Sequence, residues 1–302
     1  MKRLSLILLF LFAIMACKSP FVVAESYIEE DGKNPIFYRF TLDEKVVVKN
    51  PFGNPFESSK ASIVFVHAGG LDQEMWASQR SFLAQNYEVF TYDVRGHGRS
   101  LSKVDTALEI DDLKAFLEEV RLEKVHLVGC SLGAIISLDF VLAYPDYVDK
   151  LVLVSPGLIG VQEKSPDFLA MMTQYVGAIQ QSNQEEMLLC LKKLNALGQN
   201  ERQLTPEIDE YVTAQLEGFI ESGSYLRIPQ LKEVAPANRL GEIKSKTLIL
   251  YGEEDFDYIK TNAQKLQEGI TQSSLKSFED AAHLINLEQP EQFNRRLKAF
   301  LR

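Results

Sequence analysis

The sequence predicts an α/β protein with a mostly parallel central sheet, flanked by helices and carrying a helical cap between two core strands. From residue 63 onward, short apolar runs alternate with longer amphipathic stretches, which is typical of strands and helices in a parallel sheet. Between residues 158 and 238 this alternation stops and only helical patterns remain. The 302 residues suffice for one large domain with an insertion.

These patterns assign the elements in chain order. The first strands are expected at 36–40 and 45–48, as a short antiparallel pair that begins the sheet. Buried strands follow where apolar runs occur, at 63–67, 88–92, 125–128, 151–154, 247–251 and 275–278. Core helices are predicted from amphipathic stretches at 73–84, 106–120, 132–142, about 261–270 and 290–301.

The inserted segment contains Gln- and Glu-rich helical stretches at 167–181 and 185–197. We therefore divide the mature chain into a first core half at 25–157, a helical cap at 158–238 and a second core half at 239–302. A cap in this position would line the substrate pocket. Candidate wall residues are Phe168, Met171, Met172 and Tyr175, although each of them also suits packing of a helix on the core.

The N-terminus has the charged start and the short apolar run, at 4–15, of an export signal. This run is too short for a membrane span. The sequence Ile14-Met15-Ala16-Cys17 resembles the lipobox of bacterial lipoproteins, so we expect a signal at 1–16 and a cell-envelope protein attached to a membrane through lipidated Cys17. The alternatives are a signal at 1–24 cleaved after Val22-Val23-Ala24, giving a periplasmic or secreted protein, and a retained anchor helix.

Charge and cysteine content exclude some functions. The formal net charge is −10, and no dense basic run follows the N-terminus, so we expect no nucleic-acid partner. Only Cys130 and Cys190 follow Cys17, and a bridge between them would constrain a catalytic turn, so we expect no disulfide. The oligomeric state cannot be assigned from the sequence.

Gly129-Cys130-Ser131-Leu132-Gly133 directly follows the apolar run 125–128. This pattern is typical of a nucleophile elbow, where a strand turns sharply into a helix and exposes a serine hydroxyl. Glycine suits both flanks because a side chain there would collide with a neighbouring strand or helix. Ser131 is therefore the candidate nucleophile, and the alternative is a serine that caps the helix.

Two further segments could activate that serine. His283 follows the last predicted strand and is the candidate general base. Asp255 follows the preceding strand, which gives the chain order Ser, acid, His, and it would orient the imidazole. Glu254 and Asp257 lie close enough in sequence to compete for that role.

His67-Ala68-Gly69-Gly70 follows the first buried strand. We expect this loop and the elbow to supply backbone N–H groups that stabilise an oxyanion, from Gly69 and from Leu132. Gly70 is the alternative donor and a candidate pocket residue.

With these residues in place, the chain resembles the α/β-hydrolase superfamily from about residue 36 to residue 302, apart from the cap. The run Tyr92-Asp93-Val94-Arg95-Gly96-His97-Gly98-Arg99-Ser100 is a further hallmark of that superfamily, and the segment 67–100 looks most like its esterase and lactonase branch. Ala68, Cys130 and Ala282 depart from residues common in the family, but all reacting groups are present.

The resemblance implies a serine hydrolase that cleaves a small carboxylic ester, lactone or thioester through an acyl-enzyme, without metal or cofactor. Two other activities on the same residues are carbon–carbon bond hydrolysis and a haloperoxidase-like reaction. A function of another class would be a surface lipoprotein that binds a ligand and has lost catalysis.

Overall fold

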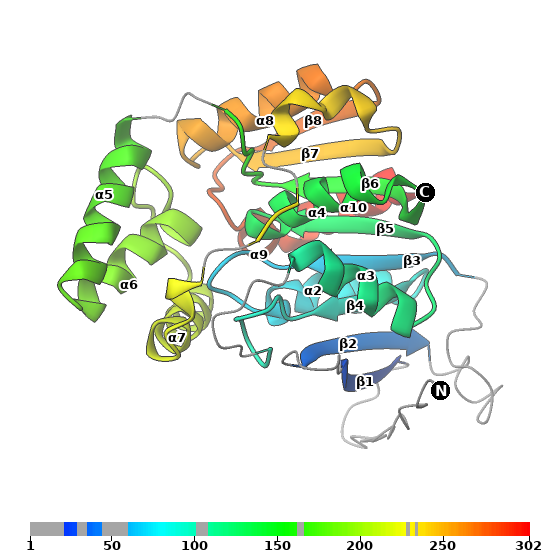
Figure 1. Cartoon of the computed structure of the whole chain (residues 1–302), viewed down its shortest axis with the longest axis horizontal. Coiled ribbons are helices and arrows are strands. Elements are labelled where there is room, and N and C mark those ends of the chain that lie inside the picture. The colour runs from blue at the N-terminus through cyan, green and yellow to red at the C-terminus, as the bar shows by residue number, and fades with distance from the viewer. Residues whose placement is uncertain are drawn as a thin grey trace.

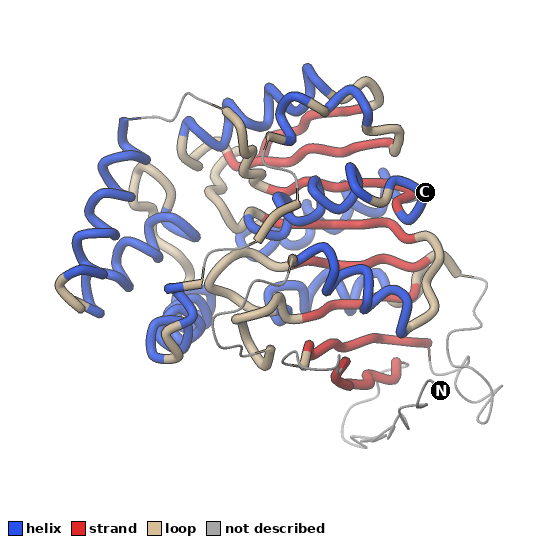
Figure 2. The backbone as a smooth tube through the Cα atoms, viewed as in Figure 1, coloured by secondary structure: helices blue, strands red, loops and turns tan. Residues whose placement is uncertain are grey.

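The computed structural model describes residues 21–28, 35–43, 60–100, 108–161, 166–227, 230–232 and 235–302. Within these ranges the chain forms one eight-stranded sheet in the order β1-β2-β4-β3-β5-β6-β7-β8, with helices on both faces (Figures 1 and 2). Neighbouring strands from β4 to β8 are parallel, whereas β1 pairs antiparallel with β2 and β2 antiparallel with β4. The predicted α/β fold is thus confirmed. The strands are β1 Phe21–Ile28, β2 Ile36–Asp43, β3 Ser62–Val66, β4 Glu88–Tyr92, β5 Val125–Cys130, β6 Val148–Val154, β7 Lys246–Gly252 and β8 Ser273–Phe278.

Several helices begin where the sequence offers starting signals. Thr205 caps the backbone N–H of Ile208 and precedes Pro206 at the start of α7, and Pro290 opens α10. The α-helices of the described residues are α2 Ala77–Leu83, α3 Glu109–Glu119, α4 Leu132–Ala143, α5 Pro166–Gln180, α6 Gln184–Lys192, α7 Pro206–Glu221, α8 Asp257–Gly269, α9 Ile285–Glu288 and α10 Pro290–Leu301. Short turns of 3-10 helix are η1 Gln73–Trp76, η2 Pro145–Tyr147, η4 Ser224–Leu226, η5 Pro236–Asn238 and η6 Leu240–Glu242, and a π-helical turn, η3, spans Lys193–Leu197.

Alternate residues of each central strand enter different apolar cores, because successive side chains of a strand point to opposite faces. Val64 and Val66 of β3 belong to the core cluster that contains residues of α3, α4 and α8, whereas Ile63 and Phe65 belong to the cluster that contains residues of α2 and α10. Both faces of the sheet are therefore covered, which explains why the strands read as continuous apolar runs.

The N-terminal edge of the sheet differs from the prediction. The strand paired with β2 along its outer side is β1, a segment that the sequence placed in or next to the export signal. The predicted strand at 45–48 lies outside the described residues. Predicted and observed strands otherwise agree closely, with β4 matching at both ends.

Helices α5, α6 and α7 lie between β6 and β7 in the chain and stand together at one end of the sheet (left in Figure 1). Side-chain contacts tie this cap to the core. Tyr211 of α7 donates a hydrogen bond to the Asp72 carboxylate at 2.8 Å. Arg227, after the last cap helix, forms a buried ion pair with Glu109 at the start of α3.

None of the helices in the described part of the chain is both long and apolar enough to cross a membrane. Cys17 and the rest of the predicted signal up to residue 20 lie outside the described residues.

Candidate active site

Ser131 stands at the turn between β5 and α4 with φ 53° and ψ −109°. A positive φ is strained for a residue with a side chain, and such strain is characteristic of functional turns. The flanking glycines allow the close packing: a Cβ on Gly133 would lie 2.2 Å from the Val66 carbonyl oxygen, and one on Gly129 would lie 2.1 Å from the Gly133 oxygen. Ser131 itself is half-buried, and the turn that carries it packs against the carboxyl end of β3 through Gly133.

Asp255 and His283 contact each other directly. The distance from His283 Nδ1 to Asp255 Oδ2 is 2.7 Å, and both side chains are buried. The other carboxylate oxygen of Asp255 accepts the N–H of Phe256 at 2.8 Å. His283 Nε2 is buried and has no hydrogen-bond partner among the described residues, so one ring nitrogen is held by the acid and the other is available.

The two acids that competed for this role are engaged elsewhere. Glu254 accepts a hydrogen bond from Asn200 of the cap at 2.6 Å. Asp257 begins α8 and pairs with Lys260 at 2.8 Å. Of the three neighbouring carboxylates, Asp255 is the one that contacts His283.

The end of β6 joins the serine turn to the histidine loop. The N–H of Ser131 donates to the Val154 carbonyl at 2.9 Å, and the next residue, Ser155, donates its hydroxyl to the His283 carbonyl at 2.7 Å. Ser155 is a residue that the sequence did not single out. The serine there, buried and with φ 43°, positions the histidine backbone, and its place after a core strand was the only signal available.

The predicted oxyanion donors lie side by side. A Cβ on Gly69 would lie 3.6 Å from the Leu132 side chain, and Leu132 is the first residue of α4, where backbone N–H groups have no partner within the helix. Gly70 has φ 74°, and a Cβ there would lie 2.6 Å from Leu216 of cap helix α7. Gly69 therefore faces the elbow, whereas Gly70 faces the cap.

His67 holds this loop against the neighbouring strand end. Its Nε2 accepts the N–H of Val94 at 2.8 Å, and its Nδ1 lies 2.8 Å from the Ala68 carbonyl oxygen. Burial lowers the pKa of His67 to about 4, so the ring is neutral at physiological pH. His67 is a structural residue of the loop 67–70.

Only some of the predicted pocket wall reaches the catalytic loops. Phe168 packs against Phe256 and Tyr258, which follow Asp255, with a ring-centroid distance of 4.4 Å to Tyr258. Met172 is half-buried in the same apolar cluster. Tyr175, by contrast, packs with the core cluster that contains α7 and α10, and burial raises its pKa to about 12.

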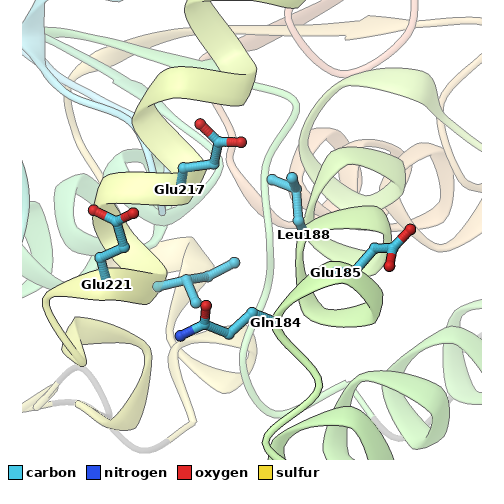
Figure 3. A pocket seen from close by; sticks show the side chains of 6 residues that line it. Gln184, Glu185, Leu188, Glu217 and Glu221 are labelled. Atoms are coloured by element: carbon cyan, nitrogen blue, oxygen red, sulfur yellow. The ribbon is translucent and has the colours of Figure 1, made fainter.

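A separate groove lies on the cap between α6 and α7. Its cavity has a volume of about 280 Å³, and Figure 3 shows side chains of the two helices on either side of the gap. None of the catalytic candidates lines it. The lining residues are Gln184, Glu185, Leu188, Glu217, Ile220 and Glu221.

Among the described residues Cys130 and Cys190 are buried free thiols, as the sequence led us to expect.

A family model described as the alpha/beta hydrolase fold matches residues 61–290. The chain belongs to the α/β-hydrolase family. Solved structures with this fold include Est816, described as an N-acyl homoserine lactone degrading enzyme, with a TM-score of 0.71 and 24% identity over 91% of this chain and 100% of that one. The carboxylesterase CesB of Bacillus subtilis has a TM-score of 0.73 and 18% identity, covering 94% of this α/β hydrolase and 93% of that chain. At these identities the likeness shows the fold alone.

Curated relatives of this α/β hydrolase carry hydrolase names. "Putative carbamate hydrolase RutD" of Agrobacterium fabrum is 27% identical over 252 residues, which is 80% of this chain and 94% of that protein. A 2-hydroxy-6-oxononadienedioate/2-hydroxy-6-oxononatrienedioate hydrolase of Pseudomonas putida is 30% identical over 266 residues, 82% of this chain and 90% of that protein. The chain is therefore an enzyme, a hydrolase of the α/β fold, rather than a binding protein without catalysis.

Proposed function

We propose that this enzyme is a serine hydrolase that cleaves an uncharged carboxylic ester, lactone or thioester with Ser131, His283 and Asp255. The observation that carries this assignment is the 2.7 Å contact between buried Asp255 and His283 Nδ1, which leaves Nε2 free. The strained turn at Ser131 is tied to the same histidine loop through the end of β6.

The proposed reaction has two steps. Asp255 accepts the Nδ1 proton, so Nε2 carries the lone pair and takes the proton of the Ser131 hydroxyl during attack on the carbonyl carbon. The N–H groups of Leu132 and Gly69 donate to the oxygen that becomes negative. The protonated imidazole then gives its proton to the leaving oxygen or sulfur, and an acyl group remains on Ser131. In the second step Nε2 takes a proton from a water molecule, whose oxygen attacks the acyl carbon. The bond to Ser131 then breaks, the acid is released and Nε2 returns the proton to the Ser131 oxygen.

The charges around the catalytic loops favour an uncharged substrate. In the described part of the chain, Arg202 pairs with Glu288, Arg227 with Glu109 and Lys260 with Asp257, so each of these three cations already has an acidic counter-ion. The apolar contacts of Phe168 with the segment after Asp255 suit an apolar acyl or alcohol group.

Carbon–carbon bond hydrolysis is the second candidate, because several curated relatives carry such names. The name of the Pseudomonas putida relative describes a dicarboxylate, whose second carboxylate needs a cationic partner. The paired cations near this site favour the ester or lactone instead.

A fluorophosphonate probe and p-nitrophenyl butyrate test the assignment. We expect labelling and turnover in the parent enzyme, loss of both in Ser131→Ala, and retention of both in Ser81→Ala, which changes an exposed serine of α2. Turnover in folded Ser131→Ala would overturn the assignment. A panel of esters, lactones, thioesters and a vinylogous dioate then separates the two candidates.

We also propose that the enzyme is exported and lipidated on Cys17. Strand β1 pairs with β2 over all of Phe21–Ile28, and cleavage after Ala24 would remove the first half of that strand. Cleavage before Cys17 leaves it whole, which favours the lipobox. Metabolic labelling with a radioactive fatty acid should mark the parent chain but not Cys17→Ala, and an unlabelled parent would reject the proposal.

A further inference from the structure

One short segment of the cap, residues 198–202, contacts both loops that carry the Asp255–His283 pair. It follows the π-helical turn Lys193–Leu197. A Cβ on Gly198 would lie 2.3 Å from the Glu254 carbonyl oxygen and 3.0 Å from the Ala282 Cβ, so the cap backbone packs directly on these loops. Asn200 donates a hydrogen bond to the Glu254 carboxylate at 2.6 Å.

The same segment reaches the histidine loop through a carboxylate. Arg202 Nε lies 3.2 Å from Glu288 Oε2, and the Glu288 side chain is only 5% exposed. Both carboxylate oxygens of Glu288 accept the N–H of Ala282, at 3.0 and 3.2 Å. Ala282 is the residue immediately before His283, so Glu288 bonds to the backbone that carries the catalytic imidazole.

The position of His283 is thus set from three sides. Its ring is oriented by Asp255, its carbonyl is held by the Ser155 hydroxyl, and the chain entering it is held by Glu288. Loss of the third contact frees the loop on one side, and a displacement of about 1 Å at a reacting group can lower a rate by about 100-fold.

The geometry points to Glu288 as a positioning residue for His283, and to Arg202 as the cap residue that holds Glu288 in place. This inference rests on the proposed function, since it concerns the base of that reaction. It makes seating of the cap on the core a condition for full activity, although Arg202 and Glu288 are assigned no contact with substrate.

The electrostatics around Glu288 agree with this arrangement. Burial raises the pKa of Glu288, and the charge of Asp255 adds to this, whereas Arg202 and the Ala282 N–H act in the opposite direction. Removing Arg202 therefore leaves a buried carboxylate without its counter-ion, and such a group moves toward water or takes up a proton.

A double-mutant cycle on the full-length enzyme tests this inference, with kcat and KM measured on p-nitrophenyl butyrate. We expect Glu288→Gln and Arg202→Met each to lower kcat by about 10-fold, because each removes the charge pair, with KM within about 2-fold. The double variant should be no slower than Glu288→Gln alone. Glu288→Ala also removes the acceptor for Ala282, and we expect a loss of about 100-fold.

The matched control is Lys193→Met, which breaks the nearby ion pair between Lys193 and Glu201 without touching either catalytic loop, and it should keep the parent kcat. The downfield proton resonance of His283 Nδ1–H reports the histidine directly. It should shift or broaden in Glu288→Gln and Arg202→Met but not in the control.

Two outcomes overturn the inference. One is an unchanged kcat in folded Arg202→Met and Glu288→Gln even where their melting temperature falls, which would make the contacts purely structural. The other is an Arg202→Met loss that is equally large in the Glu288→Gln background. Both differ from failure of the proposed function, which would appear as turnover in Ser131→Ala.

Discussion

His67 and Val94 join the loop 67–70 to the neighbouring strand end through a 2.8 Å hydrogen bond from the Val94 N–H to His67 Nε2. This bond requires a neutral ring, and burial lowers the pKa of His67 to about 4 in the folded protein. The unfolded chain has an ordinary histidine pKa of about 6.5. Between these values the unfolded state binds a proton that the folded state does not, so the free energy of unfolding falls as the pH is lowered.

We expect this histidine to account for about 2 kcal/mol of the loss in unfolding free energy between pH 7.5 and pH 5. Urea unfolding of the parent and of His67→Gln at both pH values measures it, and the loss should be smaller in the variant by that amount. His97, whose pKa burial lowers to about 3, acts in the same direction, and Asp93, whose pKa burial raises to about 6, acts in the opposite one. Both remain in parent and variant, so equal losses would contradict the prediction.

Gly133→Ala should destabilise the fold, because the added methyl group would lie 2.2 Å from the Val66 carbonyl oxygen. We expect a loss of about 3 kcal/mol in unfolding free energy, with activity lost as α4 shifts away from β3. Gly177→Ala in α5 is the control, since nothing lies within 4 Å of its added Cβ and alanine favours a helix by up to about 1 kcal/mol. Denaturation curves that move in the same direction would refute the clash.

Half-buried Ser131 has a strained backbone, with φ 53°. Ser131→Gly should therefore be inactive yet more stable than Ser131→Ala by about 1 kcal/mol, because glycine tolerates this conformation. At the ordinary helical position Ser81 the order should reverse, with Ser81→Gly less stable than Ser81→Ala. Melting temperatures of the four variants test this prediction. If glycine and alanine rank in the same order of stability at positions 131 and 81, backbone strain at Ser131 is not the cause.

Arg227 and Glu109 form a buried pair in which the side chains are 4% and 1% exposed. Arg227→Met leaves the Glu109 carboxylate buried without a counter-ion, and we expect a cost of about 3–5 kcal/mol in unfolding free energy. Adding Glu109→Gln should recover part of it, because the amide is uncharged and its oxygen can still accept the N–H of Gln230.

The exposed pair of Lys124 and Asp149, 4.0 Å apart, provides the comparison for this prediction. Lys124→Met should change the unfolding free energy far less, since exposed pairs contribute little. If both substitutions cost the same, or if Glu109→Gln deepens the loss, the buried pair does not anchor the cap as described.

Elements whose boundaries are set by local chemistry could be predicted from the sequence. Helix α10 begins at Pro290 and β4 ends at Tyr92 as the proline and the apolar run indicated. Strand β1 was missed because its apolar residues follow an export-like segment and show no hairpin signal before β2. Its pairing depends on the distant surface of the sheet.

In the candidate site too, some residues could be predicted from the sequence and others could not. Ser131, Asp255 and His283 could be proposed because each follows a core strand in the chain order of the family. Ser155 and Glu288 could not, because their importance comes from contacts with the His283 carbonyl and the Ala282 N–H. Such contacts form between residues that are brought together only in the folded chain, so a sequence motif does not reveal them.

The cap contributes no strand among the described residues, and side chains such as Tyr211, Arg227 and Arg202 attach it to the core. In evolutionary terms the two parts can therefore change at different rates. A lineage can replace the helices between β6 and β7 while hydrogen bonds within the sheet preserve the reacting atoms. If Glu288 positions His283 as we propose, a transplanted cap must also bring a cationic partner for this carboxylate, as Arg202 does here.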